Sequence, residues 1–347
     1  MADYGITQVP PADTRMMAQV DALLQSEGIR RDANLDYTCA VCDTAGQVIA
    51  TGSCFANTLR CFAVSRAHQG EGLLNTVVTH LIEYECARGN LRLFLYTKAE
   101  SAKFFADLGF YEIARVDGTL VFMENRRGGF AAYLQRLRAA RRPGKSAAIV
   151  MNANPFTLGH QYLVETAAAA CDTLHLFIVS EDASLVPFAV RRQLVLAGTA
   201  HLPNVICHDS GPYIISNATF PSYFLRDEAA VIDSHARLDL TVFTQIAAAL
   251  GITARYVGEE PSSLVTAAYN RVMQAELPKA GIDCIVVPRK TSAGAPISAS
   301  TVRQCLQHGD FATLACLVPP TTYDYFTSRE AEPVLAAIHS AGNVVHY

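Results

Sequence analysis

The sequence of 347 residues contains no long hydrophobic run, although half of its residues are hydrophobic. No apolar stretch approaches the roughly 18 residues that suggest a membrane-spanning helix, so we expect no membrane partner. Met1–Pro11 also lacks the basic, apolar and small-residue order of a secretory signal peptide. These absences predict a cytoplasmic protein.

A basic excess is absent as well. The formal net charge is −4, whereas proteins that bind nucleic acids usually present a strongly basic surface. We therefore expect no nucleic-acid partner.

The cysteines show no metal-site or disulfide pattern. The chain has 10 of them, scattered along its length, and a reducing compartment favours free thiols. Cys39 and Cys42 form a C-x-x-C sequence, but Tyr37–Asp43 alternates like a strand, which would point the two thiols to opposite faces. We expect buried thiols and no protein-bound metal.

The length suits two domains of ordinary size. In the first, residues 1–128, the patterns predict a helix at 13–28, strands at 37–42, 47–54 and 59–64, a helix at 73–88, a strand at 91–96, a short helix at 101–108 and a hairpin ending at Met123. This order, with the aromatic-x-x-LGF stretch Phe104–Phe110, resembles the GNAT acetyltransferase fold, an α+β domain.

The resemblance implies a site for a CoA-like arm. The loop containing Gln69, Gly70 and Gly72 occupies the place where that family holds the pyrophosphate of CoA on backbone N–H groups at a helix N-terminus. Ala67 stands where the family usually has Arg or Gln, and no general base stands out. We therefore expect the domain to bind the arm without catalysing acetyl transfer itself.

Residues 129–146 form a basic linker. Seven Lys or Arg residues lie between Arg126 and Lys145, and the next acidic residue is Glu165. Apolar residues from Phe130 to Leu137 recur at helical spacing, which predicts an amphipathic helix with a basic face. This helix is either a solvated connection or a docking surface for an acidic partner or a phosphate-bearing arm.

Residues 147–347 alternate short apolar strands with helical patterns. Strands are predicted at 147–151, 174–179, 204–207, 255–257 and 284–287, and helices at 160–171, 190–201, 223–250 and 263–280. Such alternation predicts an α/β domain whose parallel sheet carries helices on both faces. Ligands bind beyond the carboxyl ends of the strands in such sheets.

Two motifs fall at those ends. Thr157-Leu158-Gly159-His160 opens a helix, where free N–H groups attract anions, and Ser298-Ala299-Ser300-Thr301-Val302-Arg303 combines N-cap residues with an arginine. The pair resembles the (H/T)xGH and ISxSxxR motifs of Rossmann-like nucleotidyltransferases. The resemblance implies catalytic roles for Thr157, His160 and Arg303, and nucleotide binding by Asn154, Pro155, Phe156, Gly159, Lys290, Ser298, Ser300 and Thr301.

The whole chain resembles the citrate lyase ligase family, which combines these two domains. Further stretches carry the resemblance, including Gly211–Phe224 and Val257–Pro261. It implies an AMP-forming ligase that uses ATP, with Mg²⁺ arriving on the ATP. Acetate would become acetyl-adenylate, and the acetyl group would pass to a CoA-like thiol on the acyl-carrier subunit of citrate lyase.

Two alternatives stay open. One is an adenylyltransferase acting on a phosphopantetheine-like phosphate acceptor. The other is a non-catalytic sensor of acyl-CoA, which would not require both nucleotidyltransferase motifs.

Overall fold

The computed structural model describes residues 4–32, 34–180, 184–214, 228–259, 264–342 and 344. The chain divides into two compact units, Met1–Ala132 with Thr219–Thr241, and Tyr133–Ala218 with Val242–Tyr347. The predicted domain boundaries, at residues 1–128, 129–146 and 147–347, remain predictions.

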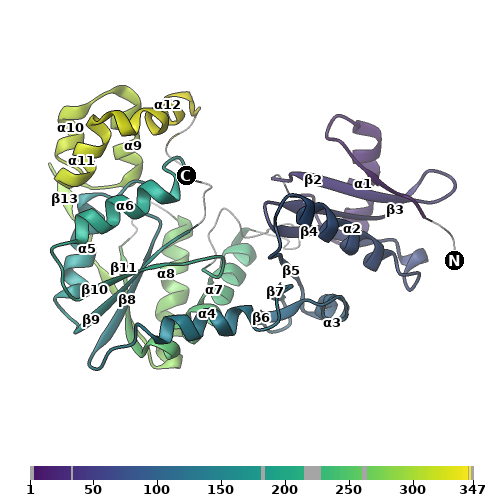
Figure 1. The fold of residues 1–347 in the computed structure, drawn as a ribbon, viewed down its shortest axis with the longest axis horizontal. Helices are drawn as coiled ribbons and strands as arrows, with labels where there is room; N and C mark the ends of the chain where they lie inside the picture. Colours follow the sequence, from purple (N-terminus) through teal and green to yellow (C-terminus); the bar gives the residue numbers. More distant parts are fainter. Residues whose placement is uncertain are drawn as a thin grey trace. The chain divides into compact units, whose positions relative to one another are not determined.

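The first unit is built on a mixed seven-stranded sheet with the strand order β1-β2-β3-β4-β5-β7-β6 (Figure 1). This is the predicted GNAT-like α+β architecture. Its strands are β1 (Ile6–Gln8), β2 (Tyr37–Cys42), β3 (Val48–Phe55), β4 (Thr58–Val64), β5 (Phe94–Lys98), β6 (Tyr111–Val116) and β7 (Leu120–Glu124). Its helices include α1 (Thr14–Ser26), α2 (Leu73–Ala87) and α3 (Ala102–Asp107), with short 3-10 turns at Arg66–His68 and Ala99–Ser101.

Two details differ from the sequence prediction. Strand β1 was not predicted, because three residues are too few to show a period. Strand β5 begins at Phe94, three residues later than predicted, and Leu91 is 74% exposed. An isolated apolar residue outside the core therefore misled the strand boundary.

The parallel strands β4 and β5 pair only at their first residues. The pairs are Thr58 with Phe94 and Leu59 with Leu95. Cys61 in β4 has a positive φ of 54°, and the β3–β4 register shifts between Thr51 and Ser53. The later parts of β4 and β5 therefore separate, which leaves room for a pocket between them.

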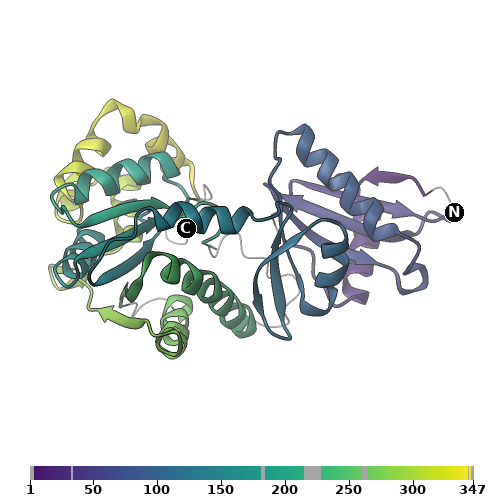
Figure 2. The same cartoon turned by 60° about the horizontal axis from the view of Figure 1, so that its bottom comes forward.

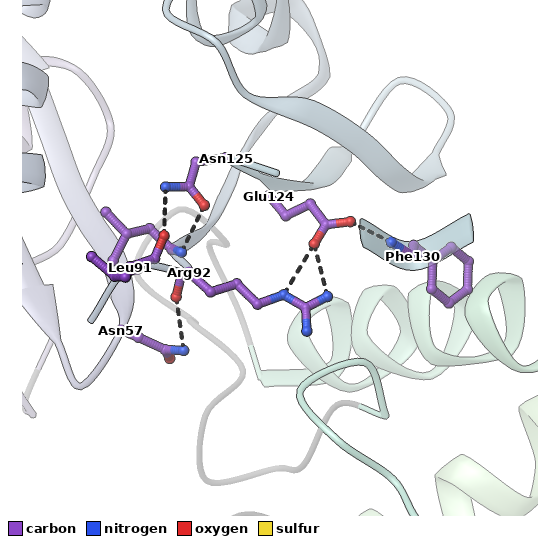
Figure 3. Close-up of polar contacts among 7 residues, drawn as sticks. Asn57, Leu91, Arg92, Glu124, Asn125 and Phe130 are labelled. Atoms are coloured by element: carbon purple, nitrogen blue, oxygen red, sulfur yellow. Dashed lines mark hydrogen bonds and ion pairs between the residues drawn. The ribbon is translucent and has the colours of Figure 1, made fainter. Parts of the chain in front are cut away.

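A carboxylate at the end of β7 starts the next helix, α4 (Gly129–Arg138) (Figure 3). The buried Glu124 accepts hydrogen bonds from the Phe130 backbone N–H at 2.6 Å and from the Arg92 guanidinium at 3.0 and 3.3 Å. A Cβ atom on Gly129 would collide with this carboxylate. The negative charge satisfies a free N–H at the helix N-terminus and favours the helix dipole.

The second unit contains a five-stranded parallel sheet with the order β10-β9-β8-β11-β12, and helices lie on both faces of it (Figures 1 and 2). The Rossmann-like prediction is confirmed. The strands are β8 (Ser146–Met151), β9 (Thr173–Ile178), β10 (Val205–Asp209), β11 (Ile252–Gly258) and β12 (Asp283–Val287). The helices include α5 (Leu158–Ala168), α6 (Phe188–Thr199), α8 (Leu264–Glu276), α9 (Ala299–His308), α10 (Phe311–Ala315), α11 (Pro320–Thr327) and α12 (Glu332–Ser340). Helix α7 (Glu228–Leu250) is divided between the two units after Thr241.

The strand order reverses beside the central strand β8. From β8 the chain moves outward to β9 and β10, then returns to place β11 on the other side of β8. In sheets of this kind, the loops leaving the central strand and its neighbours diverge at such a point, and ligands bind beyond the carboxyl ends of the strands there.

The predicted basic helix is shorter than expected. Helix α4 ends at Arg138, and Pro143-Gly144 lies in a turn before β8. A proline and a glycine with a φ of 95° are incompatible with a continuing helix. The predicted start of α7 at residue 223, and the 215–224 part of the Gly211–Phe224 stretch, lie outside the described residues.

All 10 cysteines are free, as predicted, but Cys42, which was expected to be buried, is only half-buried. Cys39 is fully buried in β2, and burial raises the pKa of its thiol to about 12. A thiol that rarely ionises behaves as a small hydrophobic side chain.

Candidate nucleotide-binding site

The turn after β8 ends in a tight cap on α5. Thr157 is the N-cap: its Oγ1 accepts from the His160 backbone N–H at 3.2 Å, and its own backbone N–H donates to His160 Nδ1 at 3.1 Å. The cap places His160 on the first turn of the helix, where unpaired N–H groups and the helix dipole favour an anion.

The cap also determines the proton position on His160. Since Nδ1 accepts a hydrogen bond, the neutral ring carries its proton on Nε2. Burial, with the positive charge of Arg289 as a second cause, lowers the pKa of His160 to about 4. Near neutral pH the side chain is therefore an uncharged Nε2–H donor.

The second motif forms a similar cap on α9. Ser298 Oγ accepts from the Thr301 backbone N–H at 3.1 Å and lies 2.8 Å from the hydroxyls of both Ser300 and Thr301. These three half-buried hydroxyls form one cluster at the helix N-terminus. A second group of donors therefore lies at the carboxyl end of the sheet.

The two motifs meet at Gly159. A Cβ atom added there would lie 3.3 Å from the Ile297 carbonyl oxygen, so any larger residue would press the loops apart. Arg289 donates to the same carbonyl at 3.3 Å and to the Glu259 carbonyl at 2.8 Å. The exposed Lys290 lies with its Nζ 5.8 Å from the centre of the Tyr162 ring on α5.

Arg303 is buried, at 2% exposure. Its guanidinium donates to the backbone carbonyls of Asn154 at 2.5 Å and of Val344 at 2.6 Å. It therefore joins α9 to the turn after β8, and its contact with a phosphate stays a prediction. Phe156 is also fully buried, and Pro155 is buried beside it.

Asn154 has one polar atom without a partner. Its Oδ1 accepts from the Val186 backbone N–H at 3.1 Å, whereas its buried Nδ2 has no hydrogen-bond partner among the described residues. An unsatisfied buried donor costs about 1–3 kcal/mol. A ligand atom reaching this turn could satisfy it.

Two supporting arginines were not singled out from the sequence. Arg191 on α6 is fully buried and donates to the carbonyls of Asn152, Val179 and Val186. Arg289 faces His160 and the Ile297 carbonyl. Its position next to Lys290 was the available signal, whereas nothing in the local sequence distinguishes Arg191 from a surface residue.

The first unit has a pocket of about 500 Å³ where β4 and β5 separate. The predicted loop residues Gln69, Gly70 and Gly72 line it, together with apolar side chains. His68 and Glu100 line it too, although no titratable group was singled out from the sequence as a base. The volume is typical of a small-molecule site.

The fold and motifs define a two-domain enzyme class, a GNAT-like domain joined to a nucleotidyltransferase domain. The family model "Citrate lyase ligase C-terminal domain" matches residues 146–326. The citrate (pro-3S)-lyase ligase of Escherichia coli strain K12 is 40% identical over 326 residues, covering 92% of this chain and 92% of the relative. The chain therefore belongs to the citrate lyase ligase family and is a ligase.

Solved structures resemble the two domains separately. A GNAT-family acetyltransferase of Staphylococcus aureus Mu50 is 15% identical and covers 35% of this chain and 99% of its own, with a TM-score of 0.30. A protein of Vibrio parahaemolyticus described as a nicotinate-nucleotide adenylyltransferase is 16% identical and covers 57% and 98%, with a TM-score of 0.37. Among the described residues, no helix is both long and apolar enough to cross a membrane.

Proposed function

We propose that this ligase activates acetate with ATP and transfers the acetyl group to a CoA-like thiol on the acyl-carrier subunit of citrate lyase. The convergence of the Thr157–His160 and Ile297–Thr301 segments beside Arg289 and Lys290 supports this best. The relatives' name points to citrate lyase as the protein acted on, and the nucleotidyltransferase site suits the chemistry.

In the first step, an acetate oxygen attacks the α-phosphorus of ATP. The bond to the β-phosphate oxygen breaks, and the products are acetyl-adenylate and pyrophosphate. The acetate is already a nucleophile, so the protein supplies alignment and donors for the charge on the phosphoryl oxygens. His160 Nε2–H and the N–H groups opening α5 and α9 are the proposed donors, and Lys290 attracts the leaving pyrophosphate.

The donor set fits a triphosphate. It contains a neutral imidazole, helix N-termini, hydroxyls and two cationic side chains, and the unpartnered Nδ2 of Asn154 adds another N–H. The described residues contain no group of three or more His, Cys, Asp or Glu suited to a metal. We propose that Mg²⁺ enters on the ATP phosphates and keeps several waters, which suits its coordination preference.

In the second step, the carrier's thiol attacks the acetyl carbonyl carbon. A thioester forms, the bond to the AMP oxygen breaks, and the thiol proton leaves to solvent or a base. The pocket lined by Gln69, Gly70 and Gly72 is the proposed holder of the CoA-like arm, since the backbone N–H groups opening α2 suit its pyrophosphate.

The proposal is tested by measuring pyrophosphate release with ATP plus acetate, ATP plus phosphopantetheine, and ATP alone. We expect release only with acetate, together with AMP once the acyl-carrier subunit is added, and acetyl trapped by hydroxylamine in its absence. Release that ignores acetate but responds to phosphopantetheine would replace this proposal with the adenylyltransferase alternative.

A further inference from the structure

Three arginines surround a second hollow in the nucleotidyltransferase unit. Its volume is about 450 Å³, and it is lined by Arg138, Arg141, Arg142, Pro143, Gly144 and Gly251. All three arginines are exposed, and no acidic side chain is among the lining residues. Volumes of about 300–1,000 Å³ are usual for small-molecule sites.

The guanidinium groups of the three arginines have no polar partner within the described part of the chain. None of them makes a hydrogen bond or an ion pair there, whereas Arg92 and Arg191 are fully engaged. The carboxylate of Asp172, which lies against Gly144, accepts from the Lys145 backbone N–H at 2.6 Å. Like charges around one hollow repel each other, and a bound anion would remove that repulsion.

This hollow lies at the opposite end of the sheet from the candidate nucleotide-binding site. Pro143 and Gly144 precede β8, and Gly251 immediately precedes β11, whereas the Asn154–His160 turn follows β8. The six residues of β8 separate the two ends by roughly 17 Å. The hollow is therefore not part of the motif cluster.

Interaction with the dipole of α4 can account for only one of the three arginines. Arg138 is in the last helical turn and there interacts favourably with the helix dipole. Arg141 and Arg142 lie beyond the helix end, in the turn before β8. Arg141 packs against Gly251, since an added Cβ there would lie 3.1 Å from its Nε. The turn therefore holds the guanidinium next to β11.

We propose that this hollow, the arginine pocket, binds a small phosphate-bearing anion separately from the nucleotide-binding site. A guanidinium offers paired N–H donors that match phosphate oxygens, and three of them can hold more than one phosphate group. The ligand is either a free phosphate compound or the phosphates of a CoA-like molecule. The site goes beyond the proposed ligase reaction and does not depend on it.

The test is arginine footprinting of the full-length protein with phenylglyoxal, read residue by residue by peptide mass spectrometry. The probes are inorganic pyrophosphate, CoA and a tricarboxylate, each compared with sodium chloride at equal ionic strength. Arg136 is the internal control, since it lies on α4 with Arg138 and is exposed, but its guanidinium lies over the Tyr133 ring and does not line the pocket.

We expect pyrophosphate or CoA to slow modification of the three pocket arginines several-fold, with Arg136 unaffected. Protection by both identifies phosphate groups alone as sufficient, and protection by CoA only assigns the pocket to a larger phosphate ester. Equal loss of reactivity at Arg136, no protection by either compound, or equal protection by the tricarboxylate would overturn the proposal.

Variants provide the second measurement. Arg141→Ala with Arg142→Ala should raise the pyrophosphate or CoA concentration that half-protects Arg138 by about tenfold or more, because charge-assisted hydrogen bonds are lost. Arg136→Ala should leave that concentration unchanged. Because footprinting reports each arginine separately, a failed ligase assay would not affect this result, and a failed footprint would not affect the ligase assay.

Discussion

At the scale of single residues, His160 has an observed contact on one ring nitrogen and a proposed one on the other. Nδ1 accepts from the Thr157 backbone and holds the cap, whereas Nε2 has no hydrogen-bond partner among the described residues and is the proposed phosphate donor. Asparagine can reproduce the first contact, because its short side chain brings an acceptor oxygen to the position of Nδ1. It cannot reproduce the second.

We therefore expect His160→Asn to fold normally but to form acetyl-adenylate about 10²–10³ times more slowly, a loss of about 3–4 kcal/mol of transition-state stabilisation. The amide of His160→Gln reaches toward the Nε2 position. We expect this variant to be more active but less stable than His160→Asn. The readouts are acetate-dependent pyrophosphate release and thermal unfolding. A folded Asn variant within fivefold of the unchanged protein would remove His160 from the reacting groups.

Arg303 combines a predicted catalytic role with an observed structural one. Arg303→Ala would leave the carbonyls of Asn154 and Val344 without their buried donor. We expect the free energy of unfolding to fall by about 2–4 kcal/mol, measured by urea denaturation with circular dichroism because the chain has no tryptophan. The exposed neighbouring variant Gln304→Ala should change stability by less than about 0.5 kcal/mol.

The same Arg303→Ala variant tests catalysis at a temperature where it remains folded. We expect pyrophosphate release to slow by about 10²–10³, since the Asn154 turn loses its support and a predicted phosphate contact disappears. A rate within fivefold, despite the lost stability, would restrict Arg303 to holding α9 against that turn.

At the scale of elements, the packing of α6 against the turn after β8 positions the candidate nucleotide-binding site. Gly198 on α6 lies directly against the buried ring of Phe156, so closely that an added Cβ would overlap it. The Phe156 ring in turn stacks on His160, with centres 5.9 Å apart and planes at 16°. The approach of α6 to the turn after β8 therefore requires a glycine.

Gly198→Ala should lower the free energy of unfolding by about 1–3 kcal/mol through overpacking, and it should also slow adenylation because Phe156 must move. Gly258→Ala is the matched control, since an added Cβ there meets nothing within 4 Å. Denaturation and pyrophosphate release are measured on both variants. Equal stability of the two would show that Phe156 has free space elsewhere.

The elements were largely predictable, because amphipathic and apolar periods report burial directly. The cap by Ser298 was predicted, because its side chain can satisfy a helix N-terminus. The cap by Thr157 was not, because the helix was expected to begin near residue 160, whereas α5 begins at Leu158. The hydrogen bonds from Arg303 to the distant carbonyls of Asn154 and Val344 could not be predicted, since a sequence shows residue type but not burial. Helices α10–α12, which follow the second motif, were not predicted.

At the scale of the whole molecule, two units must cooperate if the proposed reaction is right. Adenylation needs only the nucleotidyltransferase unit, whereas transfer also needs the arm held by the GNAT-like unit. The two steps can therefore be separated by changing the loop at the N-terminus of α2. Gly70 and Gly72 are suited to this, because nothing lies within 4 Å of a Cβ added to either.

Gly70→Glu with Gly72→Glu would place negative charge where the arm's pyrophosphate is proposed to bind. We expect acetyl-adenylate formation to stay near normal while acetylation of the carrier falls by at least tenfold. Both glycines have positive φ values, 87° and 80°, so any side chain there also strains the backbone. Gly70→Ala with Gly72→Ala carries the same strain without the charge and is therefore the necessary comparison.

The pair of variants distinguishes binding from folding. If repulsion between carboxylates and phosphates causes the defect, the Glu variant loses transfer, the Ala variant keeps most of it, and rising salt partly restores the Glu variant by screening. Similar losses in both variants would instead indicate a strained loop. Full carrier acetylation by a folded Glu variant would show that the pocket between β4 and β5 is not where the arm binds, and the arginine pocket would then be the next place to test.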